Sequence, residues 1–552
     1  MSRLAPAGAP ESDRQERSGS GIARGAALIA GLTLLSRALG LIRTLVFSQT
    51  VGAGCVGTAY VTANQVPNLL YELVVGGALT GAMVPILARS AERSADPAEK
   101  ARVSQVTSAA LTWSLLALVP MTVVVAVAAG PIASLLDPAN PNSHCNHAQV
   151  VSTTSSMLVV FAPQVVLYGI SAALFGLLQA YRRFTGPALA PVIASLVLIA
   201  SYLAFVPLAK GLPLARLPLA AQLALSGGAT LAVGALVAVG LLPAWRLHLR
   251  LRPTLRFPPG IGRRAGGLAM VGVIEIVAND LSTVAVIALA NGRGVTGALV
   301  IFNYAWLAFG SVHAVLGLAI AMSAYPVLSA RDGAVFDRTC AGSTRAIMLV
   351  SWLGTAVLVA IAAPAAHVLA RNPAQVTQVF LGLVTFAPGL AAVGVIASLS
   401  RVMFALGRLK VAAVAVTGSW VLVIVADVVL AELAPAKLVV AALGLGNTIG
   451  QTLVAVPLVI ATRRIRGRAA VAGVGRANWA GLAAAVAGTA AGVAVAVALP
   501  LGSKVAAAGI AVLAALCAMV TFSLVAYASD SGDLKSLLAQ ARRRLSGLRP
   551  SE

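Results

Sequence analysis

The chain has 552 residues, of which 59% are hydrophobic and 10% are charged, and its mean hydropathy is +0.92. These values exclude the soluble globular classes, in which about 25% of residues are charged, and they predict a polytopic membrane protein. The formal net charge of +23 does not indicate nucleic-acid binding, because the basic residues cluster on alternate connections between apolar segments, as the positive-inside rule describes.

Apolar runs long enough to cross a bilayer predict an all-α fold with about fourteen transmembrane helices. The predicted spans are 24–52, 61–88, 105–130, 151–181, 186–207, 222–242, 265–290, 297–326, 346–370, 376–406, 411–431, 437–461, 477–500 and 505–528. Both termini are expected in the cytoplasm. Residues 1–23 are polar and predict a disordered tail. Residues 529–552 predict a basic amphipathic tail on the inner leaflet, where anionic lipids would be partners; a solvated helical end is the alternative.

A repeat divides the chain. FAPQVVLYGISAALFGLLQAYRR at 161–183 is similar to FAPGLAAVGVIASLSRVMFALGR at 386–408, 225 residues further on. The repeat predicts a six-helix N-terminal lobe at 24–242, a basic cytoplasmic linker at 243–264 and a six-helix C-terminal lobe at 265–462. Because six is even, the two lobes are expected to be parallel repeats with a transport site between them. Two further helices, within 463–528, lie outside the repeat.

The four cysteines, Cys55, Cys145, Cys340 and Cys517, have no paired spacing, so neither a disulfide nor a zinc site is expected. His144, Cys145 and His147 are interpreted as neighbours by chance. The chain also lacks a nucleophile–base constellation and a phosphate-binding loop. We therefore expect a protein that is not an enzyme and that has no resident cofactor.

Arg37 and Arg43 in SRALGLIR are the strongest candidates for binding an anion, because ionisable groups within a span are costly unless they face a partner or a wet cavity. Six residues of helix separate their directions by about 120°, so both can border one cavity. Ser36 precedes them in the same motif. The alternative is that both arginines reach toward the inner headgroups.

The segment NQVPNLLYEL places Asn64, Asn68, Tyr71 and Glu72 around Pro67, which frees a backbone carbonyl. We expect these side chains to contact the substrate. Glu72 is also expected to pair with Arg37 or Arg43, a pairing that would be equally compatible with a purely structural role.

Carboxylates in later spans predict a site for a coupling monovalent cation, with neutral oxygens nearby. The candidates are Glu275, Asp280, Asp427, Asn447 and Thr448. The alternative is that the carboxyl groups are protonated or hydrogen-bonded structural groups. Coupling to the membrane potential is a second possible energy source. His313 is interpreted as a packing residue, and Arg401 as a side chain that reaches the inner surface.

The segments GLTLLSRALGLIRTLVFSQTVGAG and VTANQVPNLLYELVVGGALTGAMVPIL, within 31–88, and QAYRRFTGPALAPVIASLVLI at 179–199 resemble the MurJ/MviN lipid II flippase family, in its actinobacterial branch. This family is part of the multidrug/oligosaccharidyl-lipid/polysaccharide superfamily. In the resemblance, Arg37 and Arg43 match paired arginines of the first helix. Thr44, Tyr71–Glu72, Gly76 and Leu307 stand where many members have Asp, Arg-Arg, Glu and Arg.

The resemblance implies a multi-pass protein of the bacterial inner membrane that flips lipid II by alternating access, in peptidoglycan biosynthesis for the cell wall. It also implies that the last two helices form a groove for the polyprenyl tail. Two other functions remain open from the residues alone. One is export of amphiphilic small molecules, or of another polyprenyl-linked glycan, coupled to a cation; the other is a scaffold that recruits wall-synthesis proteins without transport.

Overall fold

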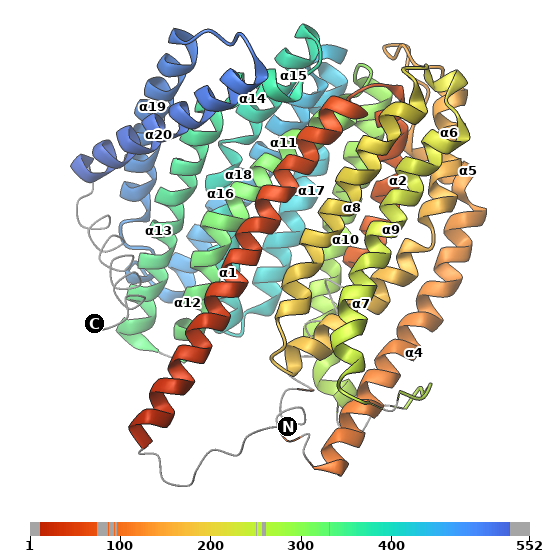
Figure 1. Ribbon diagram of the computed structural model, residues 1–552. Helices are drawn as coiled ribbons and strands as arrows, with labels where there is room; N and C mark the ends of the chain where they lie inside the picture. Colours follow the sequence, from red (N-terminus) through yellow and green to blue (C-terminus); the bar gives the residue numbers. More distant parts are fainter. Residues whose placement is uncertain are drawn as a thin grey trace.

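The computed structural model describes residues 11–73, 87, 93, 96–249, 251–256, 261–330 and 332–529. Every regular element within these ranges is a helix (Figure 1). Thirteen of the described helical segments are long and apolar enough to cross a membrane. Helix α2 (Cys55–Tyr71) lies in the predicted second span, the rest of which falls largely outside the described residues. The prediction of an all-α membrane protein with about fourteen spans is confirmed.

We refer to the eight described helices that precede the linker as the N lobe, and to the helices from the linker to α18 as the C lobe. The N lobe contains α1 (Glu11–Thr50), α2, α4 (Pro97–Val127), α5 (Ala129–Leu136), α6 (His147–Phe161), α7 (Gln164–Ala180), α8 (Thr185–Ala209) and α9 (Leu219–Trp245). The C lobe contains α10 (Ile261–Arg293), α11 (Ala298–Val312), a π-helical turn (His313–Leu318), α12 (Ala319–Ala330), α13 (Gly333–Ala360), α14 (Ala362–Leu369), α15 (Pro373–Phe386), α16 (Gly389–Ala405), α17 (Leu409–Leu433) and α18 (Val439–Arg466). Helices α19 (Val474–Ala498) and α20 (Lys504–Ser529) come last.

The two lobes repeat the same breaks. Pro163 separates α6 from α7 with φ −58° and ψ −23°, and Pro388 separates α15 from α16 with φ −63° and ψ −26°. Each proline lacks the N–H that a continuous helix would need, so the helix breaks at the same point of the FAP motif. The hairpin α8–α9 likewise corresponds to α17–α18, each with a short 3₁₀ turn between its helices. These shared breaks are the structural form of the repeat at 161–183 and 386–408.

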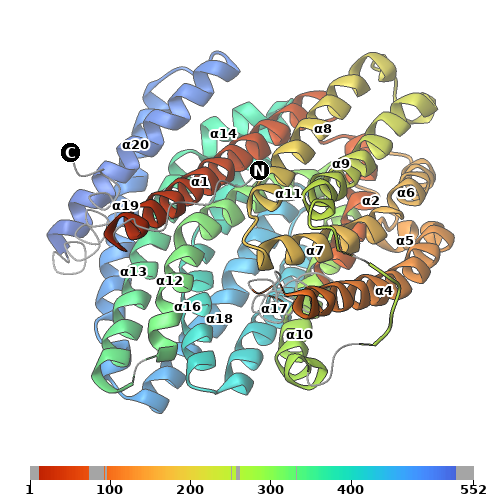
Figure 2. The same cartoon turned by 60° about the horizontal axis from the view of Figure 1, so that its bottom comes forward.

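Helix α1 connects the lobes across the front of the molecule (Figure 1). It packs along α8 and touches α14 near its C-terminal end. In Figure 2, with the bottom of Figure 1 brought forward, α1 crosses from the side of α13 and α19 to the side of α8. Its first residues correct one prediction: residues 11–23 are helical, because Glu, Gln and Arg in this stretch are good helix formers that extend the apolar helix. Residues 1–10 and the predicted tail at 530–552 lie outside the described residues.

The basic linker is partly fastened to the N lobe. Residues 251–256 are extended along α4, where the backbone N–H of Arg252 donates to Ser108 Oγ at 3.0 Å and that of Thr254 donates to Thr112 Oγ1 at 3.2 Å. Trp113 Nε1 donates to the carbonyl of Leu255 at 3.1 Å. The connection between the lobes is thus held against the N lobe over these residues.

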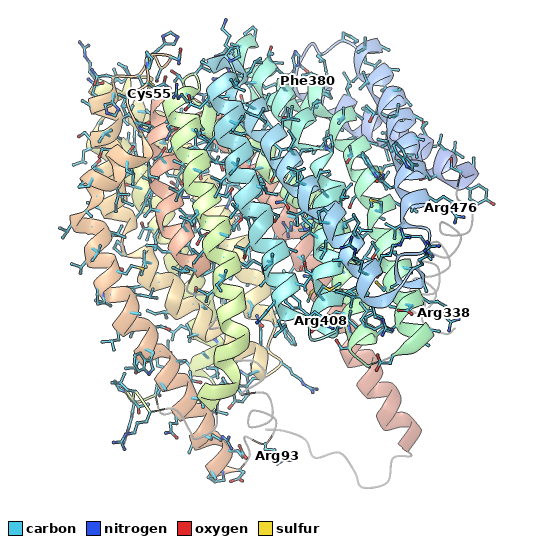
Figure 3. The ribbon with its side chains drawn as sticks, turned by 180° about the vertical axis from the view of Figure 1, so that it is seen from behind. Cys55, Arg93, Arg338, Phe380, Arg408 and Arg476 are labelled. Carbon is cyan, nitrogen blue, oxygen red and sulfur yellow. A yellow bond between two sulfur atoms is a disulfide. The ribbon has the colours of Figure 1, made fainter. Side chains whose placement is uncertain are left out.

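The two ends of the molecule differ in chemistry. Arg93, Arg338 and Arg408 lie toward the lower end in Figure 3, whereas Cys55 lies at the opposite end.

Cys55 forms a disulfide with Cys145, with their Cα atoms 5.7 Å apart, so the prediction of no disulfide was wrong. The sequence separation of 90 conceals the contact, because the loop before α6 folds back onto the start of α2. The sulfur of Cys145 is therefore not available to a metal with His144 and His147.

Candidate substrate cavity

A cavity of about 850 Å³ lies between the lobes. Its wall comes from α1, α2, α7, α8 and α9 of the N lobe and from α11 of the C lobe. Helix α1 borders it over about four turns, from Thr33 to Phe47. The wall on α8 and α9 is mostly apolar, with Leu198 and Leu236 among its residues, while α1 and α2 supply most of the polar groups. The cavity therefore has one polar side and one apolar side.

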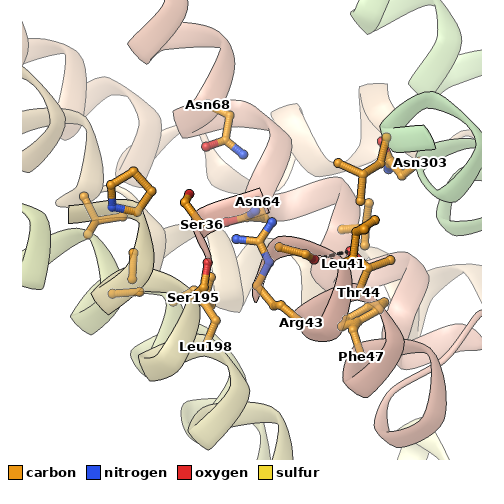
Figure 4. Close-up of a pocket in the computed structure, with 18 of the residues that line it drawn as sticks. Ser36, Leu41, Arg43, Thr44, Phe47, Asn64, Asn68, Ser195, Leu198 and Asn303 are labelled. Atoms are coloured by element: carbon orange, nitrogen blue, oxygen red, sulfur yellow. Dashed lines mark hydrogen bonds between the residues drawn. The ribbon is translucent and has the colours of Figure 1, made fainter. Parts of the chain in front are cut away.

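Arg37 and Arg43 both line this cavity, as the sequence predicts. Arg37 is exposed to it and Arg43 is half-buried. Figure 4 shows Arg43 extending into the space beside Asn64. No carboxylate belongs to the described lining, so these two guanidinium groups are its only charges. Such a cavity favours an anionic ligand, because a guanidinium donates several hydrogen bonds in a geometry that suits phosphate oxygens.

The polar residues predicted on α2 divide between two faces of the helix. Asn64 and Asn68 line the cavity, as does Ser36 of α1, and Tyr168 of α7 donates its hydroxyl to Asn68 Oδ1 at 3.0 Å. Tyr71 does not belong to the lining; its ring lies 4.4 Å from that of Tyr168. The side-chain amides of Asn64 and Asn68 thus face the cavity, whereas Tyr71 packs against Tyr168 outside the lining.

Glu72 also lies outside the lining and does not pair with Arg37 or Arg43. Its Oε2 accepts a hydrogen bond from Asn279 Nδ2 of α10 at 3.2 Å. Gln65, one heptad earlier, donates to Asn303 Oδ1 of α11 at 3.4 Å. Residues seven apart share a helical face, so Gln65 and Glu72 form a stripe toward the C lobe. This stripe explains why the predicted pairing of Glu72 with Arg37 or Arg43 is absent.

Several neutral polar residues of the cavity were missed by the sequence analysis. Gln65, Asn303 and Tyr168 line it, as do Tyr60 and Tyr202, whose hydroxyls lie 3.1 Å apart. A search for ionisable groups in spans does not find amides and phenols. The signal that could have found Tyr60 is its spacing of four residues from Asn64, because residues at that spacing share a helical face.

The predicted cation ligands do not form one site. Asp427 is buried, and an atom added at the Cα of Gly446 would lie 2.1 Å from its Oδ1. Asn447 and Thr448 follow on α18 and face Gly389, and Thr448 donates to the carbonyl of Thr385 at 2.7 Å. Asp427 Oδ1 has no hydrogen-bond partner. Asp427 therefore lies against α18, whereas Asn447 and Thr448 face α16 and α15, and Thr448 is only half-buried.

Asp280 and Glu275 lie elsewhere along α10. Arg293 of α10 donates to Glu432 of α17 at 2.6 Å, so these two residues lie at the same depth in the helix bundle. Asp280 precedes Arg293 by about 20 Å of helix, whereas Asp427 precedes Glu432 by about 8 Å. Glu275 is a further turn away and lies near Arg401 of α16, whose guanidinium donates to the carbonyl of Ala397 at 2.6 Å. Asp280 and Glu275 are thus at other depths than Asp427, and the five predicted ligands do not share one site.

The sequence model of a family described as "Lipid II flippase MurJ" matches residues 47–506. The chain is 32% identical over 182 residues to the lipid II flippase MurJ of Burkholderia cenocepacia, covering 33% of this chain and 34% of that protein. It is 28% identical over 174 residues to the probable lipid II flippase MurJ of Rhizobium meliloti, covering 32% and 31%. The aligned part thus spans about a third of these curated relatives.

Three solved structures share the fold over most of the chain. A lipid II flippase MurJ in an inward closed conformation has a TM-score of 0.68 and 15% identity, covering 91% of this chain and 99% of that one. An inward-facing multidrug resistance MATE transporter has a TM-score of 0.62 and 14% identity, covering 81% and 98%. An outward-facing MATE transporter has a TM-score of 0.53, with 15% identity and coverage of 81% and 96%.

Proposed function

Because the chain belongs to the lipid II flippase MurJ family, we propose that it moves lipid II across the bacterial inner membrane by alternating access. The observation that carries this proposal is the interlobe cavity, whose only charges in the described lining are Arg37 and Arg43. An amphiphile with an anionic diphosphate fits such a space. A cationic amphiphile does not, because the cavity would repel it.

Arg37 and Arg43 bind the pyrophosphate in this proposal, while Asn64 and Asn68 hydrogen-bond to the sugar or peptide. The apolar wall on α8 and α9 accommodates the less polar parts of the headgroup. The polyprenyl tail stays in the lipid, in a groove beside α19 and α20. Only the headgroup crosses, so the protein needs to open its polar cavity to each side in turn.

The proposed orientation has both termini in the cytoplasm. Two independent features support it: basic residues gather at one end, and the Cys55–Cys145 disulfide lies at the other (Figure 3). Cytoplasmic loops carry an excess of Lys and Arg, and disulfides persist on the oxidising side of the membrane. In this orientation the disulfide end is the outer end of the protein.

Depletion of the protein tests the proposed function directly. In cells without a redundant flippase, depletion should reduce the lipid II exposed on the outer leaflet several-fold while lipid II accumulates inside. Exposure is measured by cleavage of lipid II with an externally added lipid II hydrolase. Unchanged exposure in depleted cells would show that another protein moves lipid II.

Asp427, buried where α17 meets α18, supports coupling to a monovalent cation. A desolvated carboxylate oxygen without a hydrogen-bond partner is a suitable ligand for a hard cation. Sodium should therefore raise the unfolding temperature of the purified protein relative to choline at equal ionic strength, and Asp427→Asn should remove that difference. Asp280→Asn, on another level of the bundle, is the matched control and should keep it. A sodium effect that survives Asp427→Asn excludes this site and leaves the membrane potential as the energy source to be tested.

A further inference from the structure

The outer end of the N lobe grips the C lobe at two separate points. The first grip is the loop at 137–146. Asn140 Nδ2 donates to the carbonyls of Asn291 and Gly294, both at 2.6 Å. In return, Asn291 Nδ2 donates to the carbonyl of Leu136 at 2.9 Å. The two asparagines thus hold the α5–α6 loop against the end of α10.

The second grip is formed by Arg371, between α14 and α15. Its guanidinium donates to the carbonyl of Thr50 at 2.7 Å and to that of Val51 at 3.3 Å, and it also contacts the carbonyl of Gln49. The last carbonyls of a helix have no partner within the helix and carry partial negative charge, so a cation bound there is stabilised. Arg371 therefore caps the outer end of α1.

The disulfide joins the N-lobe sides of the two grips. Cys145 belongs to the loop of the first grip, and Cys55 begins α2 directly after the turn at 51–54. That turn is part of the second grip: the carbonyl of Ala53 accepts from Gln375 Nε2 at 3.1 Å. On its other side the turn abuts Gly297, where an added Cβ would lie 2.3 Å from the oxygen of Ala53. The turn is thus enclosed by two C-lobe loops and covalently attached to the loop at 137–146, which binds the first of these C-lobe loops, between α10 and α11.

We propose that the Cys55–Cys145 disulfide makes these two interlobe contacts a single latch, which closes the outer route to the cavity and opens only when both contacts release together. The proposal rests on alternating access as the proposed function. Because the disulfide ties the loop at 137–146 to the turn at 51–54, neither can leave the C lobe while the other remains bound. Without the disulfide, one contact can open alone at the expense of its own hydrogen bonds.

The test is a set of variants assayed for outer access to the cavity. Cys340 and Cys517 are first replaced by alanine, and Ala194→Cys supplies a reporter in the cavity lining. The rate at which a membrane-impermeant maleimide labels this reporter in intact cells measures outward opening. With the disulfide present, Asn140→Ala and Arg371→Gln should each raise the rate roughly tenfold, and their effects should multiply in the double variant.

In the Cys55→Ala/Cys145→Ala background the basal labelling rate should rise, because opening of the weaker contact alone then gives access to the cavity. The substitution at the stronger contact should lose its effect on the labelling rate. The proposal is overturned if the basal labelling rate is the same with and without the disulfide. It is also overturned if the effects of Asn140→Ala and Arg371→Gln still multiply when the disulfide is absent. Arg293→Gln is the matched control, because its ion pair with Glu432 lies at the same end but within the C lobe.

Two further measurements separate the outcomes. Treating the disulfide-containing protein with an impermeant phosphine reductant, which is then washed away, should reproduce the alanine pair, so a folding defect in that variant does not decide the result. Labelling at the Ala194→Cys position is here read by peptide mass spectrometry, because the freed thiols of Cys55 and Cys145 also react with the maleimide. Lipid II exposure is measured in the same cells. A latch that behaves as described in a protein that leaves lipid II exposure unchanged would refute the proposed function and not the latch.

Discussion

Replacing Arg43 with alanine is expected to abolish flipping, with a loss of roughly 10–100-fold in lipid II exposure at unchanged protein level. Arg43 is the half-buried one of the two cavity cations, and a hydrogen bond to a charged group contributes about 1.5–3 kcal/mol. Its loss leaves Arg37 as the only cation of the described lining. Arg43→Lys should retain part of the activity, because lysine keeps the charge but does not bind a phosphate through two parallel hydrogen bonds. The assay is cleavage of exposed lipid II in cells that express only the variant.

The control for Arg43→Ala is Arg338→Ala. Arg338 lies at the basic end, outside the cavity, and donates to the carbonyl of Ala334 in its own helix at 3.2 Å. Arg338→Ala removes the same type of side chain outside the proposed substrate cavity, so flipping activity should stay close to that of the unmodified protein. Full activity of both Arg43→Ala and Arg37→Ala would disprove a passage for a diphosphate through this cavity.

Replacing Gly450 with alanine is expected to destabilise the C lobe by about 1–3 kcal/mol, through overpacking. A Cβ at Gly450 would lie 2.5 Å from the backbone nitrogen of Val423 and 2.6 Å from its Cα. These are backbone atoms of α17, so no side-chain rotation relieves the contact and the two helices have to separate. The separation would also disturb Asp427, one turn along α17. The measurement is the unfolding temperature of the purified protein in detergent.

Gly418→Ala is the matched control for Gly450→Ala. Gly418 lies on α17, and a Cβ there meets nothing within 4 Å. Since alanine is the better helix former by about 1 kcal/mol in a helix interior, this variant should be as stable as the unmodified protein or more stable. A similar loss in both variants would mean that helix-wide effects, and not the contact with Val423, determine the result.

The fold could be predicted from the sequence because two of its signals are local. Apolar length gives the spans, and the FAP motif at 161 and 386 gives the repeat along with the helix breaks that the structure shows at Pro163 and Pro388. The cavity arginines could be predicted for a similar reason. A permanent charge in an apolar helix is costly unless it faces water or a partner. The positions of Arg37 and Arg43 within a span therefore indicate a water-accessible cavity.

The features that escaped prediction depend on contacts between distant segments. The pairing of Cys55 with Cys145 requires the path of the loop at 137–146, which no spacing encodes. The partner of Glu72 is an uncharged amide on α10, and a search for opposite charges cannot find it. The carboxylates of α10 and α17 were grouped by chemical type, whereas their depth in the bundle separates Asp280 from Asp427.

Helices α19 and α20 have a practical consequence for following motion. A Cβ at Gly488 or Gly492 would lie 2.8 Å from a backbone oxygen of α20, so these two helices touch through their backbones. Trp352 Nε1 of α13 donates to Asn478 Oδ1 of α19 at 3.1 Å, which fastens the pair to the C lobe. A fluorophore at the end of α20 therefore travels with that lobe. Paired with a second fluorophore on the α8–α9 hairpin, it would report the movement of the C lobe relative to the N lobe without a label in the interlobe cavity.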